Sequence, residues 1–537
     1  MKKINLFIVL FMLVLSACAP TTSSSSSSEE VSSSSEQSSS QSSSSEQPSS
    51  ENSEPPIGEY KFDFYNINDF HGHVAVEDTK SASTYCPGVS TLSANLNNFK
   101  SENPDGYVFT NSGDMFQETY EAYVTKGQAI SSILNAMDCE AFGVGNHEFD
   151  WGVDALMDNK DELGECNLLG ANVYYYDEAN KKIGNPAYDL FEPYTIINRH
   201  GFNIGIIGII GTGQLTSITS SNWENLTFVN PTDIVKDLAY SLKEEQDCRI
   251  VIVLGHGEFN DFGGYYGMNE KITAEYKDNT RYVDGMFLGH SHRRENKKVN
   301  GVPFIQSYGR GSQVSHFELT YNSGTKEVSC TQAENIDIQI NNNLKDEKID
   351  AILDGYFPSE FYEDIDKSIG TFINGTKTIS KTISGRFQAY AGYEAIKDLY
   401  PDVVLVGNNG GRSDVNIYDD YSVSKEMIFR MVPFTNKLCI ASIKGSDINS
   451  NFRSSNCYYM PEDVVIESNK YYQVAVIDYM LLHKSTDRKY NYFTSFSGEY
   501  ESYNTYPCDL IVNYFVQNEN IDLSFLANDQ GFSYLNN

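Results

Sequence analysis

The sequence is poor in basic residues. Its 537 residues include 39 Lys and Arg against 73 Asp and Glu, which gives a formal net charge of −34 at pH 7. We do not expect such a chain to bind long nucleic acid, because binding to a phosphate backbone depends on clustered Lys and Arg. A small anionic substrate is still compatible with this charge, because a few cations in one cleft can outweigh the net charge.

Cysteine motifs are also missing. No Cys-x-x-Cys or Cys-x-His spacing occurs, so a zinc site built from cysteines is not expected. Eight cysteines follow Cys18, and an exported chain permits disulfides between them, although their pairing cannot be read from the sequence. They are Cys86, Cys139, Cys166, Cys248, Cys330, Cys439, Cys457 and Cys508.

The N-terminal apolar run, Ile4–Leu15, is too short to span a bilayer as a stable helix. It follows two lysines and ends in Leu-Ser-Ala-Cys, which is typical of a secretory signal, and this tetrad resembles the bacterial lipobox. We therefore expect residues 1–17 to be removed and Cys18 to carry a lipid that anchors the protein in the membrane. The alternative is an ordinary signal peptide with an incidental cysteine. Either way, the protein would lie outside the cytoplasm, at the bacterial surface or in the periplasm.

Residues 18–57 are dominated by Ser, with Glu and Gln and no basic residue. A stretch of this composition cannot bury a core, so we expect a flexible tether. It would hold the folded part of the chain away from the membrane.

From Tyr60 onward, short apolar runs typical of buried strands alternate with helical segments, which predicts an α/β fold. Five of the nine histidines stand just after such a run, and so do several Asp and Asn residues. In open α/β sheets ligands bind at the carboxyl ends of the strands. The side chains expected at this edge are Asp69, His71, Asp114, Asn146, His147, Asp150, His256, His290 and His292.

Carboxylate, amide and imidazole ligands without thiolate suit divalent Mn, Zn, Fe or Co. Two metal ions about 3.5–4 Å apart need several such ligands each, together with a bridging carboxylate. Each of these residues taken singly is also compatible with a turn or a helix cap, but the whole set favours a site for two metals.

Four motifs carry a family resemblance. They are Asn68-Asp69-Phe70-His71-Gly72-His73, Asn111-Ser112-Gly113-Asp114, Gly145-Asn146-His147-Glu148-Phe149-Asp150 and Gly289-His290-Ser291-His292. In order and approximate spacing they resemble the bacterial 5′-nucleotidases, which are exported dimetal phosphoesterases. The resemblance covers roughly residues 60–480. It implies an N-terminal four-layer α/β/β/α metallophosphoesterase domain (58–342), a helical linker (343–369) and a C-terminal α+β substrate-binding domain (370–537).

The resemblance also implies a role for each site residue. Asp69, His71 and His292 would hold one metal. Asn146, His256 and His290 would hold the other, and Asp114 would bridge the two. A hydroxide bound by the metals would attack phosphorus, while His147, oriented by Asp150, would stabilise the transition state. His73 and Glu148 are expected to support the site rather than to bind metal.

In the second domain the resemblance is weaker. Gly407-Asn408-Asn409-Gly410-Gly411-Arg412 resembles a substrate loop of the family, although it is one residue shorter, which leaves Asn408 and Asn409 as alternatives. Phe434 would stack on the base and Asn436 would hydrogen-bond it, while Arg412 and Arg386 would contact phosphate. The family's glycine-rich loop with a second stacking aromatic is missing, so Tyr490, Tyr492 and Phe493 are candidates for that role.

We therefore predict metal-dependent hydrolysis of extracellular nucleotides, as in nucleotide salvage, with no obligate protein partner. The altered substrate loops leave two alternatives within the same chemistry, a 2′,3′-cyclic nucleotide phosphodiesterase and a nucleotide-sugar pyrophosphatase. An alternative of another class is a surface binding lipoprotein that merely retains the fold.

Overall fold

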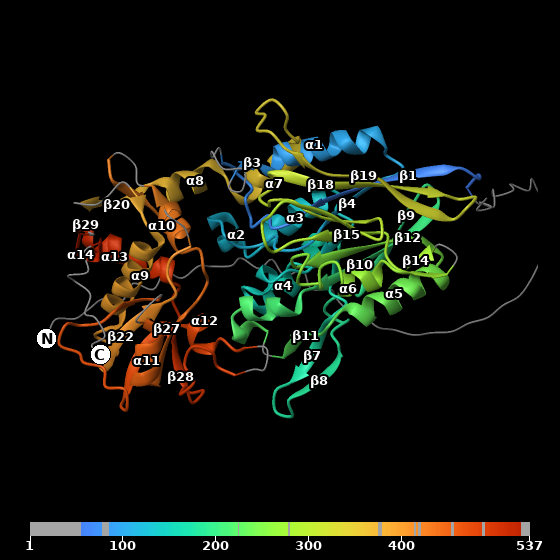
Figure 1. The fold of residues 1–537 in the computed structure, drawn as a ribbon. Coiled ribbons are helices and arrows are strands. Elements are labelled where there is room, and N and C mark those ends of the chain that lie inside the picture. Colours follow the sequence, from blue (N-terminus) through green and yellow to red (C-terminus); the bar gives the residue numbers. More distant parts are fainter. Residues whose placement is uncertain are drawn as a thin grey trace, which may run out of the picture. The chain divides into compact units, whose positions relative to one another are not determined.

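The computed structural model describes residues 55–77, 85–223, 225–277, 280–373, 378–412, 415–416, 420–452, 456–485, 489–522 and 524–527 (Figure 1). The predicted signal peptide, the lipid site at Cys18 and nearly all of the predicted tether lie outside these ranges. No helix within them combines the length and the hydropathy that a membrane crossing requires. The eight cysteines of the described part of the chain are free thiols.

Two six-stranded sheets form the centre of the N-terminal half (Figure 1). The first has the order β19 (Glu327–Asp337), β18 (Gln313–Asn322), β1 (Glu59–Ile67), β4 (Tyr107–Asn111), β5 (Ala141–Gly143), β6 (Asn167–Leu169). The second has the order β16 (Glu295–Val299), β17 (Val302–Gln306), β15 (Gly285–Leu288), β12 (Cys248–His256), β10 (Phe202–Ile210), β9 (Tyr194–Arg199).

The two sheets pack face to face through large apolar side chains. Phe64 and Phe317 of the first sheet and Phe287 of the second are fully buried. The ring of Phe317 lies 5.3 Å from that of Phe64 and stacks on that of Phe287 at 4.4 Å. Burying one such side chain stabilises the fold by roughly 1.5–3 kcal/mol. These contacts hold the two sheets together behind the site.

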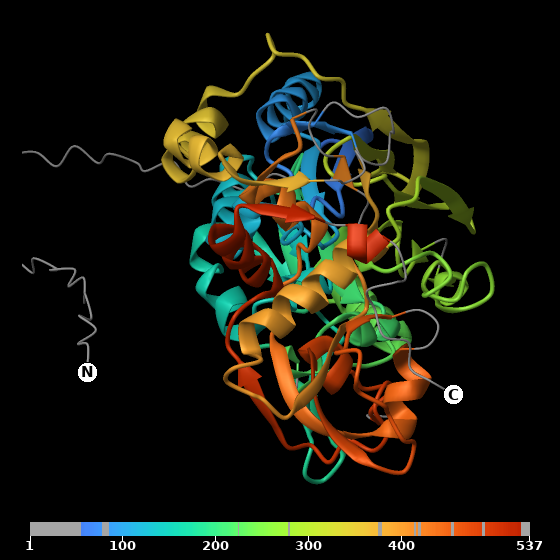
Figure 2. The same cartoon turned by 90° about the vertical axis from the view of Figure 1, so that its left-hand side faces the viewer.

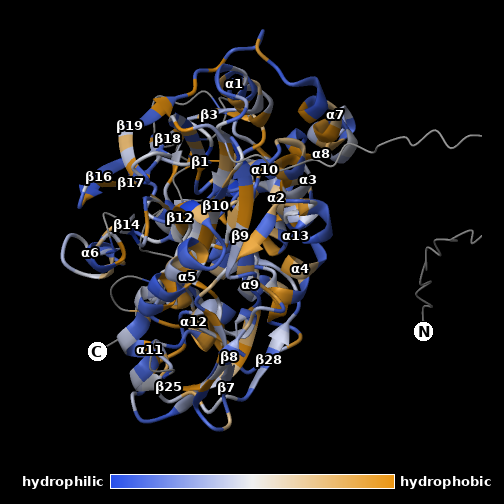
Figure 3. Ribbon diagram, turned by 90° about the vertical axis from the view of Figure 1, so that its right-hand side faces the viewer, coloured by the Kyte–Doolittle hydropathy of each residue, from blue (hydrophilic) through white to orange (hydrophobic). Residues whose placement is uncertain are grey.

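Helices cover the outer face of each sheet. On the first sheet they are α1 (Val89–Glu102), α3 (Gln128–Ala136) and α7 (Glu347–Tyr356), and on the second α5 (Thr232–Glu244) and α6 (Met268–Ile272). The buried residues of α5 are Val235, Ala239 and Leu242, a spacing that places them on one face of the helix. Figure 3 colours the ribbon by hydropathy and shows both hydrophilic and hydrophobic residues on the helical part of the fold. The predicted α/β/β/α order of layers is confirmed.

Parallel pairing brings the carboxyl ends of the central strands together. Ile67 of β1 is paired with Asn111 of β4, and Ile210 of β10 is paired with His256 of β12. The loops that leave these strands therefore start at a common edge. The predicted metal ligands of this half lie in those loops or at the strand ends.

The C-terminal half has a mixed five-stranded sheet. Its order is β26 (Cys457–Tyr459), β22 (Val403–Asn408), β27 (Tyr471–Ile477), β25 (Leu438–Lys444), β28 (Tyr500–Tyr503). Helices α9 (Lys381–Ile396) and α13 (Pro507–Asn518) pack on one face, and α11 (Gly445–Phe452) and α12 (Asp478–Leu482) pack on the other. Figure 2 shows this part in orange and red, with α9 and α13 in front. The α10 helix (Lys425–Met431) packs beside α13.

The chain passes between the halves through two helices, α7 and α8 (Ser359–Asp366), where the sequence predicts one helical linker. Phe357 and Pro358 separate them, and Pro358 stands just before α8, where its missing N–H costs no helical hydrogen bond. Sequence analysis missed a separate three-stranded sheet of β11 (Leu226–Phe228), β7 (Val173–Asp177) and β8 (Lys182–Pro186). Its strand β8 is exposed along most of its length and has no apolar run to mark it.

Candidate metal centre and cavity

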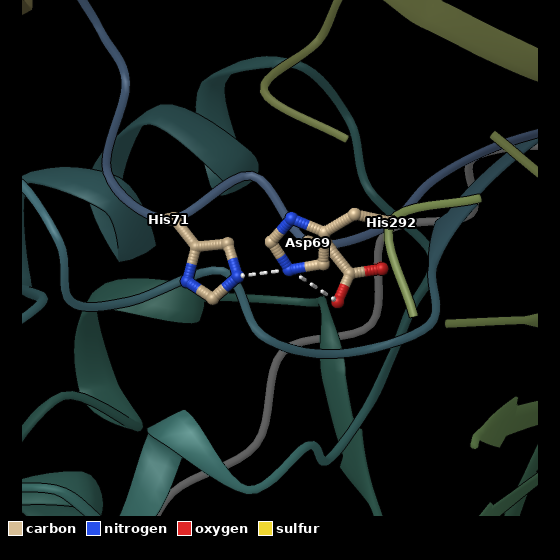
Figure 4. Close-up of side chains that lie close together, drawn as sticks. All are labelled: Asp69, His71 and His292. Carbon is tan, nitrogen blue, oxygen red and sulfur yellow. Dashed lines mark hydrogen bonds and ion pairs between the residues drawn. The ribbon is translucent and has the colours of Figure 1, made fainter. Parts of the chain in front are cut away.

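Asp69, His71 and His292 come together at the edge where β1 and β15 end (Figure 4). Nε2 of His71 lies 2.9 Å from Nε2 of His292, which in turn lies 3.5 Å from Oδ1 of Asp69. Asp69 and His71 are fully buried. One donor atom of each of the three residues lies within 4.8 Å of the others, so this group can hold one ion.

Asp114, His256 and His290 form a second group of the same kind. Oδ2 of Asp114 lies 3.1 Å from Nε2 of His256. Oδ1 of Asn146 lies 3.1 Å from the same nitrogen and 3.0 Å from Nδ1 of His290. The two groups are adjacent, because the backbone N–H of His290 donates to the Asp69 carboxylate at 2.9 Å. The structure therefore brings together all seven residues that the sequence predicts as metal ligands.

Most of these residues have an unusual backbone conformation. Asp69, His71, Asp114, His290 and His292 all have positive φ, between 50° and 77°. Side chains other than Gly rarely adopt this region, and each such residue costs of order 1–3 kcal/mol. Backbone hydrogen bonds hold the turns in place, from Asp69 N to Gly113 O at 3.0 Å and from His71 N to Asp114 O at 3.1 Å.

Two glycines allow the loops to approach one another. A Cβ on Gly113, whose φ is 90°, would lie 2.7 Å from Nδ1 of His256. A Cβ on Gly145 would lie 2.4 Å from Oδ1 of Asp114. Neither position has room for a side chain, so the Gly-Asp and Gly-Asn-His motifs need their glycines for steric reasons.

Glu148 organises the centre of the site without being one of the clustered ligands. Its buried carboxylate accepts hydrogen bonds from the backbone N–H groups of Asp114 at 3.0 Å, Met115 at 2.8 Å and Gly145 at 2.7 Å. It therefore ties the loop after β4 to the loop after β5. This agrees with the supporting role predicted for it.

The electrostatics of the site fit a pair of cations. Burial lowers the pKa of His71 well below its usual value and that of His292 to about 4, so both rings are neutral, as metal ligation requires. Burial raises the pKa of Asp69 to about 7, and the nearby Asp114 adds to this rise, although the charge of His256 acts to lower it. For His256, burial acts to lower the pKa, but Asp114 and Asp69 outweigh it and raise the pKa to about 9. The carboxylates of Asp69 and Asp114 therefore favour a positive charge between the two ligand groups.

The orientation of the donor atoms also fits. Nδ1 of His256 lies 2.9 Å from the Ser112 carbonyl oxygen, which can only accept a hydrogen bond, so Nδ1 carries the ring hydrogen. Its Nε2 therefore faces the Asp114 and Asn146 oxygens, and His71 and His292 face each other through ring nitrogens. Lone pairs opposed at these distances need a proton or a metal ion between them. Divalent Mn, Zn, Co and Fe match this N and O donor set.

His147 and Asp150 form a pair beside the two groups. Nδ1 of His147 lies 2.7 Å from Oδ2 of Asp150, and the backbone N–H of His147 donates to Oδ1 of Asp114 at 2.8 Å. Burial acts to lower the pKa of His147, but Asp150 and Asp114 outweigh it and raise the pKa to about 10. The ring can therefore donate a proton or a hydrogen bond into the adjacent cavity.

A cavity of about 550 Å³ joins the metal-ligand groups to the C-terminal half. It is large enough for a small organic ligand. One side carries Asp114, Asn146, His147, His290 and His292. The other side carries the predicted substrate residues Asn409, Arg412, Phe434 and Asn436. The two sets, 100 or more residues apart in the sequence, thus face one space.

The structure separates the alternatives in the substrate loop. Asn408 is buried and binds backbone, since its Nδ2 donates to the Gly385 carbonyl and its Oδ1 accepts from Gly410 N. Asn409 lines the cavity. Arg386 does not line it and instead donates from Nη1 to the Leu526 carbonyl at 2.9 Å. Its position on α9 thus gives no support to the predicted phosphate contact.

The aromatic residues of the cavity differ from those expected. Phe493 is fully buried in the core of the C-terminal half, and neither Tyr490 nor Tyr492 is among the cavity residues. Tyr479, Tyr500 and Tyr506 line the cavity in their place. Tyr479 and its neighbour Asp478 directly follow the apolar strand β27 (Tyr471–Ile477), so the strand-end pattern could have found them.

Sequence analysis also missed Gln117 and Glu118, which follow Asp114 in the same loop. Nε2 of Gln117 donates to the carbonyl oxygen of Pro433 at 2.7 Å, next to Phe434. The Glu118 carboxylate is buried and accepts hydrogen bonds from Arg412 and Arg310. This short segment thus connects the loop that carries Asp114 directly to the predicted substrate residues of the other half.

Comparison with known proteins agrees with this geometry. The family of calcineurin-like phosphoesterases matches residues 62–294. A 5′-nucleotidase of Mus musculus is 23% identical over 451 residues, which cover 75% of this chain and 72% of that protein. A cell wall protein of Listeria monocytogenes is 22% identical over 462 residues, covering 73% of this chain and 56% of that protein.

Among solved structures, the 5′-nucleotidase precursor of Thermus thermophilus superposes with a TM-score of 0.66 at 16% identity. The superposition covers 89% of this chain and 100% of that chain. At this identity the likeness concerns the fold, and it extends over both halves.

Proposed function

The chain carries a calcineurin-like phosphoesterase domain and is a metal-dependent hydrolase of phosphate esters, and from this premise we propose that its substrates are extracellular 5′-nucleotides. One observation carries the proposal. A single cavity is lined by the metal-ligand groups on one side and by a guanidinium, an aromatic ring and an amide on the other. These are the groups that a phosphate, a base and its polar edge require.

Seven residues of the N-terminal half would bind the two metal ions. Asp69, His71 and His292 would hold one ion; Asn146, His256 and His290 would hold the other, and Asp114 would bridge them. When bound, two divalent cations supply Lewis acidity and a nucleophile at neutral pH.

On the side of the substrate, Arg412 and Asn409 would orient the phosphate while Phe434 packs on the base. Asp150 holds Nδ1 of His147, which leaves Nε2 to donate to a phosphoryl or leaving-group oxygen.

A location outside the cytoplasm is part of the proposal. It is supported by the N-terminal signal pattern ending in Cys18 and by the cell wall protein among the relatives. We propose that a lipid on Cys18 and the Ser-rich tether hold the enzyme at the membrane for nucleotide salvage. Mass spectrometry of the mature N-terminus from the producing cell would test this part independently of activity.

The decisive experiment separates and quantifies, by chromatography, the products that residues 58–537 form with added Mn or Zn, and it measures released inorganic phosphate alongside. The panel contains mononucleotides, a nucleoside diphosphate, a 2′,3′-cyclic nucleotide and a nucleotide sugar. We expect 5′-mononucleotides to have the highest kcat/KM and Asp114→Asn to abolish the activity. Full activity in that variant, or preference for a cyclic or sugar nucleotide, would contradict the proposal.

A further inference from the structure

Asn436, at the cavity, has both of its amide hydrogens engaged. Its Nδ2 lies 2.8 Å from Oδ1 of Asp478 and 3.3 Å from Oγ1 of Thr219. Asp478 begins α12 of the C-terminal half, whereas Thr219 belongs to the N-terminal half. The amide nitrogen is therefore held by one partner from each half of the chain. Asn436, Asp478 and Thr219 all line the cavity.

The orientation of this amide follows from chemistry. An ionised carboxylate can only accept hydrogen bonds, so the nitrogen of the amide has to face Asp478. The same Oδ1 of Asp478 accepts the backbone N–H of Tyr479 at 2.7 Å, which fixes the carboxylate. Burial raises the pKa of Asp478 to about 6, so the group is still mostly ionised at pH 7.5. Lys437, the nearby cation among the described residues, also favours the ionised form.

With its nitrogen held, Asn436 has only its carbonyl oxygen left for a ligand. This oxygen has no partner among the described residues, and Phe434, two positions earlier, lines the same cavity. A base packed on Phe434 would therefore meet a hydrogen-bond acceptor and no donor at Asn436.

We propose that Asp478 fixes Asn436 as an acceptor and thereby makes the cavity select nucleobases that present an amino group over those that present a carbonyl. The inference rests on the nucleotide substrate proposed above and assigns a specificity-determining role to Asn436 and a positioning role to Asp478. Adenine and cytosine carry an exocyclic amino donor where hypoxanthine and uracil carry a carbonyl acceptor. An acceptor facing the Asn436 oxygen leaves two buried lone pairs opposed and unsatisfied.

The test compares pairs of substrates that differ only in this group. We would measure kcat/KM by phosphate release for AMP against IMP and for CMP against UMP at pH 7.5. The intact protein should prefer the amino-bearing member of each pair by about tenfold or more, as sites built to hydrogen-bond one group reject its analogue. Since the phosphate and sugar are the same within a pair, the ratio reports on the base site alone.

Variants distinguish a specific effect of Asp478 on base selectivity from a general loss of structure or activity. In Asp478→Asn the new amide can donate, so Asn436 can turn and present its nitrogen, and the AMP-to-IMP ratio should fall to one or invert. Asn436→Leu removes the acceptor in a similar volume and should also bring the ratio to about one. The matched control is Asp509→Asn, which changes another partly buried carboxylate of this half, bound to Tyr123 and absent from the cavity lining. It should keep the ratio of the intact protein.

Each outcome decides between the two proposals. Hydrolysis of all four nucleotides with equal kcat/KM, or preference for IMP, would overturn this inference and leave the proposed function standing. Hydrolysis of an aryl phosphate but of no nucleotide would overturn both. Calorimetric binding of adenosine and inosine gives a readout that needs no turnover, and equal affinities would count against the selection of amino groups.

Discussion

Glu118 and Arg412, which lie 294 residues apart in the sequence, form an ion pair across the boundary between the two halves. The Glu118 side chain is only 5% exposed and also accepts a hydrogen bond from Arg310 at 3.3 Å. The Arg412 side chain, by contrast, is 44% exposed and borders the cavity. A carboxylate from the metal-ligand loop thus sets the position of the cation that would meet the phosphate.

Replacing Arg412 should weaken substrate binding. We expect Arg412→Ala to raise KM for a mononucleotide by about 10- to 100-fold, because a charge-assisted contact to phosphate contributes about 1.5–3 kcal/mol. Glu118→Gln should raise KM less, since the guanidinium remains but loses its anchor. Steady-state phosphate release for both single variants and the double variant would show whether Glu118 acts through Arg412. If it does, the double variant is no worse than Arg412→Ala, whereas fully additive effects would contradict this account.

The two ligand groups predict a defined metal content. The intact protein should retain two equivalents of Mn or Zn after dialysis, measured by elemental analysis. His292→Ala and His256→Ala each remove a ligand from a different group and should each lose about one equivalent. His200→Ala is the matched control, because its ring binds the Lys61 carbonyl and lies outside both groups. A single equivalent in the intact protein would contradict a site for two metals.

His147 and Asp150 should affect turnover more than metal content. His147→Ala removes the proton donor at the cavity and should lower kcat by about 10²- to 10⁴-fold. Asp150→Asn keeps the ring but alters its orientation, so we expect a smaller loss of about 10- to 100-fold. Stopped assays together with elemental analysis would check this. A loss of metal in step with activity would instead make the pair a structural support of the metal site.

Asp478 predicts a pH dependence of stability. Burial raises its pKa in the folded state to about 6, above the usual 3.8, so the folded chain binds more protons than the unfolded chain between these values. The stabilising contribution of protonated Asp478 is therefore fully present below about pH 4 and is lost as the pH rises through about 6. The loss amounts to about 3 kcal/mol in the free energy of unfolding.

Chemical denaturation of the intact protein and of Asp478→Asn at pH 4, 5, 6 and 7 would measure this effect. The variant lacks the titrating group and does not lose this contribution. The difference in the free energy of unfolding, variant minus intact protein, should therefore increase as the pH rises. Because both proteins share all other titrating groups, the difference isolates Asp478. Parallel curves over this range would show that the carboxyl group has an ordinary pKa in the folded state.

Much of the catalytic half could be predicted from the sequence because its signals are local. A buried strand such as β10 is a continuous apolar run, and the His and Asp residues stand directly after such runs. Parallel pairing then brings strand ends together whatever the details of the loops. This is why Asp69, His256 and His290 were expected at one edge before any tertiary contact was known.

The substrate side depended on tertiary contacts that no local pattern reports. Arg386 sits on a helix in a plausible segment, but its guanidinium binds the Leu526 carbonyl, which only packing near the C-terminus decides. Glu118 looks like an ordinary loop acid until Arg412 and Arg310 are seen to bind it. Asp478 and Tyr479 are an intermediate case, since they directly follow the apolar strand β27 and thus share the strand-end position of the predicted metal ligands.

The left-handed backbone at Asp69, His71, Asp114, His290 and His292 has a consequence for protein engineering. A search for more stable variants that scores only backbone fit would favour glycine at these five positions, because each relieves a cost of order 1–3 kcal/mol. Every such gain would remove a predicted metal ligand. Stability and activity are therefore opposed at the same residues, and thermostable forms of this enzyme have to be sought elsewhere in the chain.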